Sequence, residues 1–126
     1  MGSPPGGIGP RSVTNHAGVP QIVNTTFVAN AGSTLVVDGT GLTGGQKIKL
    51  HSFLMSADTV GTITLASSGI STQTPLIGRL EVLADSPVSQ DGGLIYGLGI
   101  CAQGANLSVS SVGGGVDGNL SYSIVP

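Results

Sequence analysis

The sequence predicts an all-β fold: an antiparallel β-sandwich of jelly-roll type with roughly eight strands and an extended N-terminal arm. From residue 20 onward, short runs of Val, Ile, Leu and Thr are separated by Gly, Asn, Asp and Ser. Several runs alternate apolar and polar residues, as half-buried antiparallel strands do. Only 8% of the 126 residues are charged, against roughly a quarter in an ordinary soluble domain. Such a chain is expected to work by packing against neighbours.

The N-terminal arm comes first. Residues 1–19 are rich in Pro and Gly and show no apolar periodicity, so we expect an extended segment, followed by a β-sandwich domain over residues 20–126. The prolines lower the entropy cost of ordering an extended chain. The arm residues expected to contact a partner are Pro4, Pro5, Ile8, Pro10, Arg11, Val13, His16 and Val19. The opening residues lack the basic and apolar regions of a secretory signal, so we expect no secretion by that route.

The strands are expected where the apolar runs lie. Their predicted ranges are 21–29, 34–37, 47–57, 61–66, 76–84, 94–101, 107–112 and 119–125. The segment 79–85 also fits a short helix, because Leu76, Leu80 and Leu83 would share a helical face. We prefer a strand there.

Alternation within the strands indicates which side chains are buried. The residues expected in the core are Ile48, Leu50, Leu54, Ile63, Leu65, Leu107, Val109, Leu120, Tyr122 and Ile124. On strand 47–57 the opposite face carries Lys47, Lys49 and His51. We interpret that face as solvated, with a small anion or partner contact as the alternative.

No residue pattern marks catalysis or cofactor binding. Residues 39–44 match the G-x-G-x-x-G motif, but a strand-like segment follows where the motif needs a helix N-terminus, so we interpret them as a hairpin loop. His16, His51 and the single cysteine, Cys101, show no metal-ligand spacing, and Cys101 is expected to be a buried hydrophobe. Three copies of His51 around an ion on a threefold axis, and a Ser-His-Asp assembly around His51, stay open. Without a G-x-S-x-G motif, we predict that the protein is not an enzyme and uses no cofactor.

Charge narrows the range of partners. The four basic residues are scattered and the net charge is −2, so we do not expect the protein to bind nucleic acid. No apolar run is long enough to cross a membrane. The polar strand faces and edges carry few charges that would prevent lateral pairing. We therefore expect a closed homo-oligomer, with a homotrimer as the first choice.

Four segments carry a further pattern: 45–58 (GQKIKLHSFLMSAD), 62–69 (TITLASSG), 104–110 (GANLSVS) and 116–122 (VDGNLSY). Together they resemble small structural proteins of tailed bacteriophages, the group that includes capsid decoration (cement) proteins. The first two segments look like that group's first long strand and its paired strand, and the last two like its closing hairpin. The resemblance covers about residues 45–125. The segment 94–100 departs from it, because a more aromatic strand is expected there.

This resemblance implies a non-enzymatic virion protein on the outside of an icosahedral head. It would contact the major capsid protein at threefold or quasi-threefold positions, stabilise the shell, and be made in the cytoplasm of a bacterial host. The structural alternative is a tail-fibre, head-fibre or baseplate knob. The alternative from another class is a host-surface, glycan-binding module, for which Tyr96 is the residue suited to stack on a sugar, although we expect it beside the core.

Overall fold

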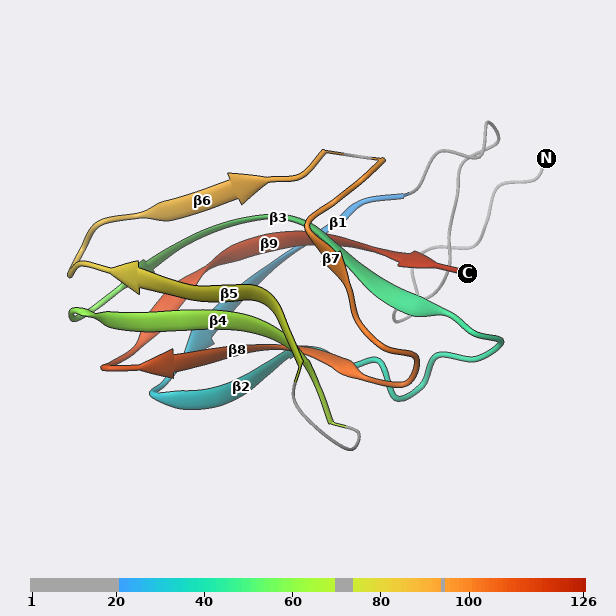
Figure 1. Cartoon of the computed structure of the whole chain (residues 1–126), viewed down its shortest axis with the longest axis horizontal. Coiled ribbons are helices and arrows are strands. Elements are labelled where there is room, and N and C mark those ends of the chain that lie inside the picture. The colour runs from blue at the N-terminus through green and yellow to red at the C-terminus, as the bar shows by residue number, and fades with distance from the viewer. Residues whose placement is uncertain (1–20, 70–73, 94) are drawn as a thin grey trace.

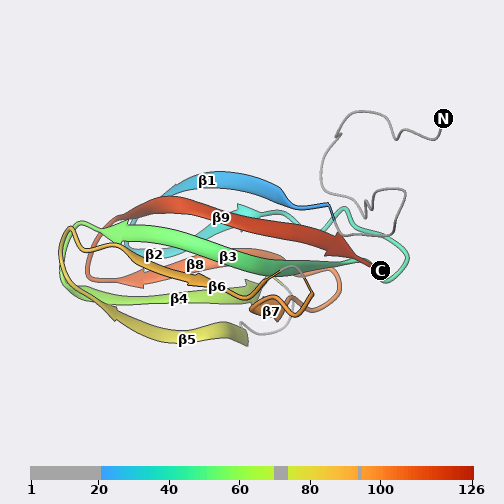
Figure 2. The same ribbon diagram turned by 90° about the horizontal axis from the view of Figure 1, so that it is seen from above.

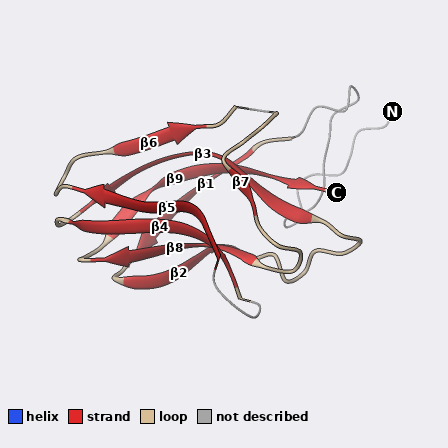
Figure 3. Ribbon diagram, viewed as in Figure 1, coloured by secondary structure: helices blue, strands red, loops and turns tan. Residues whose placement is uncertain are grey.

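The computed structural model describes residues 21–69, 74–93 and 95–126, and every regular element in those ranges is a β-strand (Figure 3). The all-β prediction is therefore confirmed for the described part of the chain. Residues 1–19 lie outside it, so the division into an arm and a domain stays a prediction.

The strands form two sheets, which Figure 1 shows face on, one in front of the other, and Figure 2 shows as two packed layers. The first has the order β1-β9-β3-β6, with β7 also paired to β3, and the second has the order β2-β8-β4-β5. The first sheet contains β1 (Val23–Ala29), β3 (Lys47–Ala57), β6 (Val88–Asp91), β7 (Gly99–Ile100) and β9 (Val116–Val125). The second contains β2 (Gly32–Val37), β4 (Gly61–Ser68), β5 (Thr74–Val82) and β8 (Asn106–Val112). All pairings between these strands are antiparallel, as predicted.

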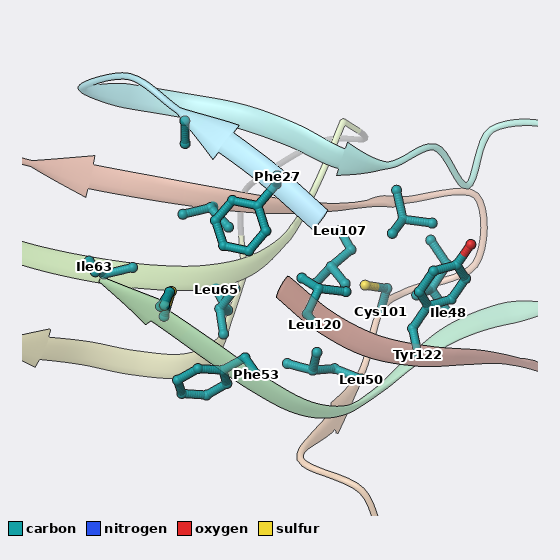
Figure 4. Packing of buried hydrophobic residues seen from close by; sticks show 14 of the residues in the cluster. Phe27, Ile48, Leu50, Phe53, Ile63, Leu65, Cys101, Leu107, Leu120 and Tyr122 are labelled. Carbon is teal, nitrogen blue, oxygen red and sulfur yellow. The ribbon is translucent and has the colours of Figure 1, made fainter. Parts of the chain in front are cut away.

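One hydrophobic core fills the space between the sheets (Figure 4). The first sheet contributes Phe27 from β1 together with the inward side chains of β3 and β9, and the second sheet contributes those of β4 and β8. The core residues predicted from alternation are buried, with one exception: Leu54 is 46% exposed. The prediction that Leu54 belongs to the core is therefore wrong.

A β-bulge at His51 explains the exception. Leu50 faces Tyr122 of β9 and Ser52 faces Ser121, so His51 is an extra residue in β3. One inserted residue reverses the alternation beyond it, because side chains in a strand alternate with a period of two. Phe53 and Met55 consequently point into the core, and Leu54 points out.

The predicted hairpins are wrong, because in each of them the two strands lie in different sheets. β3 and β4 lie in different sheets, and so do β8 and β9. The loop of residues 38–46, predicted as a hairpin loop, likewise connects β2 in one sheet to β3 in the other. A half-buried strand has the same alternation whether its successor pairs beside it or packs across the core. The sequence pattern therefore does not distinguish a hairpin from a crossing.

The predicted strand at 94–101 is reduced to the two residues of β7, and β6 was not predicted. The reason is the backbone at Gly93 (φ +79°) and Gly97 (φ +66°), which lies in the left-handed region and turns the chain. The preference for a strand over a helix at 79–85 is correct as far as Val82, where β5 ends. The described residues thus hold nine strands, where about eight were predicted.

The bulge is tested by truncating two adjacent side chains of similar size. Met55→Ala is expected to lower the free energy of unfolding by about 2–5 kcal/mol, because it leaves a cavity in the core. Leu54→Ala is expected to cost about 0.5 kcal/mol or less, as for an ordinary surface position. Urea unfolding followed by circular dichroism measures both values. A larger loss for Leu54→Ala would contradict the register described above.

Candidate functional site

The candidate site is the loop of residues 92–98, which joins β6 to β7 (Figure 1); residue 94 is outside the described part of the chain. The backbone of this loop is fastened to β3. The Gly92 amide donates to the His51 carbonyl (2.8 Å), and the Leu98 amide donates to the Leu50 carbonyl (2.7 Å). The Gly97 amide closes the base of the loop by donating to the Gly92 carbonyl (3.1 Å).

The side chain of His51 adds a second attachment. Its Nδ1 lies 2.9 Å from the Gly93 carbonyl oxygen, and its Nε2 lies 2.8 Å from the Ser123 hydroxyl. A carbonyl only accepts, so Nδ1 carries the proton, and in the neutral ring Nε2 accepts from Ser123. Because His51 is buried, these bonds are shielded from water. The imidazole therefore links the loop to both β3 and β9.

Two further polar contacts hold the loop. The Lys49 ammonium donates to the Ile95 carbonyl. The Asp91 carboxylate accepts from the Gly93 amide (2.8 Å) and so closes the turn that leaves β6. The backbone of the loop is thus restrained from the β3 side and from the end of β6.

At its tip the loop exposes two large side chains. Ile95 is 76% exposed and Tyr96 is 86% exposed. A restrained backbone that presents an aliphatic and an aromatic side chain to solvent is typical of a protein-binding contact, because little conformational entropy is lost on binding. The expectation that Tyr96 lies beside the core is wrong.

The loop lies at the end of the sandwich where the chain enters β1. Val23, the first residue of β1, pairs with Tyr122 of β9, and Tyr122 pairs with Leu50 on its other side. Leu50 is also the residue that receives the Leu98 amide. The start of β1 therefore lies at the level of the loop, with β9 and β3 between them.

The interpretation of the polar face on β3 changes. Lys47 and Lys49 are half-buried, but His51, predicted to lie with them on a solvated face, is only 3% exposed. The bulge turns the imidazole into the gap between β3, β9 and the loop. The predicted arm contacts, which lie outside the described residues, are Pro4, Pro5, Ile8, Pro10, Arg11, Val13, His16 and Val19.

The surroundings of His51 do not suit a metal site or a nucleophile. Both ring nitrogens bond within the chain, so three copies cannot converge on one ion without breaking those bonds. Ser123 is fully buried, and the group on Nδ1 is the Gly93 carbonyl where a catalytic triad places a carboxylate. Across the described ranges, no group of three or more His, Cys, Asp or Glu side chains is arranged to hold a metal ion.

The other motifs noted in the sequence are structural. In the described structure β3, not a helix, follows residues 39–44, and the Gly39 amide donates to the Asn106 side chain (2.9 Å), so the dinucleotide motif lacks its phosphate-binding helix. Beside it, hydrogen bonds from the Thr40 hydroxyl and amide lower the pKa of the Asp38 carboxyl. Cys101 is buried as predicted.

Comparison with known proteins identifies no relative: no protein-family model, curated protein or solved structure matches the chain. The resemblance to bacteriophage structural proteins therefore stays a prediction. Among the described residues there is no helix of the length and apolarity needed to span a membrane.

The sequence contains a signal for this loop that the prediction of a strand at 94–101 did not use. Glycine occupies positions 92, 93, 97 and 99 around the apolar residues, and strands are depleted in glycine. Glycines at that density indicate a loop that carries apolar side chains. The attachment to His51 had no such signal, because it depends on the bulge.

The role of His51 is tested by His51→Leu. This variant leaves the Gly93 carbonyl and the Ser123 hydroxyl without their partner, which is expected to lower the free energy of unfolding by about 1–3 kcal/mol. The amides of Gly92 and Leu98 should also exchange faster with deuterium, as measured by NMR. Ser56→Ala, on the same strand but away from the loop, is the control. Unchanged exchange at both amides in His51→Leu would contradict the role of His51.

Cys101 provides a pH test of burial. Desolvation raises the pKa of its thiol from 9.0 to about 11, against a smaller opposite effect of the Ser67 hydroxyl. Its contribution to stability is therefore complete below pH 9 and is lost as the pH rises through about 11. Over that range the wild type should lose roughly 2–3 kcal/mol relative to Cys101→Ala. Urea unfolding of both proteins at pH 8 and pH 11 measures the difference; equal losses would contradict it.

Proposed function

We propose that this protein is a non-enzymatic structural protein of a bacteriophage virion, a capsid decoration protein. In this proposal it binds the major capsid protein on the outside of the head as a symmetric homo-oligomer, with a trimer as the expected form, and stabilises the shell. The observation that carries the proposal is the restrained loop with the exposed pair Ile95 and Tyr96. The location in a virion rests on the resemblance of residues 45–125 to structural proteins of tailed bacteriophages.

We further propose that the fold is a jelly roll. β6 and β7 both pair with β3 on the side opposite β9, so together they occupy one strand position. Eight positions then remain, four in each sheet, in the orders β1-β9-β3-β6 and β2-β8-β4-β5. Successive strands cross between the sheets at six places: β1 to β2, β2 to β3, β3 to β4, β5 to β6, β7 to β8, and β8 to β9. This alternation supports two interlocked Greek keys.

The tip and the arm would act together on the shell. In this proposal Ile95 and Tyr96 insert into an apolar hollow of the capsid protein, and residues 4–19 lie along the capsid or a neighbouring knob. The start of β1, which follows the arm in the sequence, lies at the same end of the domain as the loop, because Val23 pairs with Tyr122 and Tyr122 with Leu50. Each contact is small, but several held in one oligomer bind together at a high effective concentration.

A glycan-binding module is the second candidate. Tyr96 was expected beside the core, but it is exposed, and its ring can therefore stack on a sugar. The tail-fibre, head-fibre or baseplate knob differs from the leading proposal only in where the oligomer is attached. Cryo-electron microscopy of particles from the source virus distinguishes these locations. Density at threefold or quasi-threefold positions of the head supports decoration, and density confined to the tail or fibres contradicts it.

The tip is tested by Tyr96→Ala and Ile95→Ser in a co-sedimentation assay with capsids that lack this protein. Each variant is expected to weaken binding by about tenfold or more, as for truncation of a central contact residue. Val60→Ser is the control, because Val60 is also an exposed aliphatic residue but lies in the loop between β3 and β4. Equal loss of binding in Val60→Ser would contradict a specific role of the tip. Glycan binding that requires Tyr96, without capsid binding, would favour the second candidate.

The arm is tested by deleting residues 1–19. The truncated protein is expected to stay folded and oligomeric, because the deletion ends before β1 begins at Val23. Its occupancy on capsids should fall, and circular dichroism and sedimentation provide the folding control. Unchanged occupancy would remove the arm from the mechanism.

A further inference from the structure

Among the described residues the two sheets have four edge strands: β1 and β6 in the first, and β2 and β5 in the second. An edge strand has unpaired backbone amides and carbonyls along one side, which favour pairing with another chain. Natural proteins protect such edges with charges, prolines, bulges or very short strands. The four edges of this domain differ sharply in that protection.

The edges formed by β5 and β6 are protected. β5 carries Pro75, Arg79 and Glu81, all exposed, and its pairing with β4 is interrupted by two register shifts. β6 has only four residues, is preceded by Pro87 and ends at Asp91. Both strands therefore discourage a further strand from pairing beside them.

The edges formed by β1 and β2 carry none of the side chains that protect the others. Their sequences, VNTTFVA and GSTLVV, contain no charged residue and no proline. β1 pairs with β9 over all seven residues without a register shift, and β2 has one shift against β8, between Leu35 and Val37. Large apolar side chains are exposed along both strands: Val23 and Val28 on β1 and Leu35 on β2. Only residues 30–31 separate the two strands, so they form one continuous side of the sandwich, which we call the β1–β2 edge.

We infer that the β1–β2 edge is the surface through which copies of this chain contact one another. This inference rests on the homo-oligomer of the proposed function and names the interface within it. A second copy is the occupant that the chemistry favours, because an uncharged edge does not repel its own copy, whereas like charges opposite each other are unfavourable. Association covers Val28 and Leu35 and removes the open edge from solvent.

The position of the β1–β2 edge is compatible with simultaneous binding to a capsid. The tip of the 92–98 loop is attached to β3 on the side away from β9, whereas β1 is attached to β9 on the opposite side. Contacts between copies and contacts through Tyr96 therefore use different surfaces. A mutation at one surface should leave the other intact.

The test places one lysine on each edge strand of the first sheet. Val28→Lys changes a residue of β1 that is 80% exposed, and Ser89→Lys changes an exposed residue of β6 as its matched control. By sedimentation velocity the wild type is expected to be an oligomer of the 12.3 kDa chain. Val28→Lys should raise its dissociation constant by tenfold or more, the equivalent of about 1.4 kcal/mol, and Ser89→Lys should leave it unchanged. Circular dichroism checks that both variants are folded.

A second measurement locates the interface without adding charge. Cys101 is buried, so an introduced cysteine is the accessible thiol among the described residues. Val28→Cys is expected to react with a maleimide at least tenfold more slowly in the oligomer than after dilution to monomers. Ser89→Cys should react at the same rate in both. Protection at position 89 instead of position 28 would overturn the inference, as would a wild type that is monomeric at every concentration.

The outcomes for the interface and for the function are separate. A monomer that binds capsids overturns the interface and leaves the decoration role standing. An oligomer that Val28→Lys dissociates, but that binds no capsid, supports the interface and contradicts the decoration role. A dimer dissociated by Val28→Lys supports the interface and corrects the expected trimer.

Discussion

The β-bulge at His51 is the local feature on which both the core and the candidate binding loop depend. By adding one residue to β3 opposite β9, it reverses the alternation of the strand, so Phe53 and Met55 complete the core in place of Leu54. It also turns the imidazole away from solvent and into the protein. There its two nitrogens form hydrogen bonds to the loop and to β9. Bulges of this kind re-aim side chains at the rim of a sheet. Here the result is a loop whose backbone is held while Tyr96 at its tip is exposed.

The few charged residues are unevenly distributed between the two sides of the sandwich. The side of the sandwich formed by β5 and β6 has prolines, charged residues and two register shifts. The side formed by β1 and β2 has no charge, no proline and one register shift, in β2. The apolar tip of the 92–98 loop belongs to the protected side, because it is anchored on β3 next to β6 and β7. A protein that must bind its own copies and a larger surface at once needs two such separate regions. This separation is compatible with the proposed decoration role and the inferred interface.

Much of the fold was predictable because each strand encodes its buried face locally. Ile63, Leu65, Leu107 and Val109 are buried where alternation places them, since β4 and β8 pair with each other without a register shift. The prediction failed at His51, where one extra residue reverses the inward–outward alternation of β3. It also failed at Gly93 and Gly97, where glycines turn an apolar segment into a loop. It also failed for the connections, because a strand that crosses to the opposite sheet buries the same face as one that pairs beside its predecessor. The candidate site shares these limits, since Tyr96 follows an apolar run and yet lies exposed.

The sequence by itself determined that this is an all-β, charge-poor chain with no local pattern for metal binding or catalysis. Those properties depend on composition and on spacing between near neighbours. Only the tertiary structure decided that β3 and β4 lie in different sheets, that His51 binds Ser123 from 72 residues away, and that Tyr96 is exposed. It also decided which strands are edges, because an edge is defined by the strand that is missing beside it. No property of the seven residues of β1 alone records that absence.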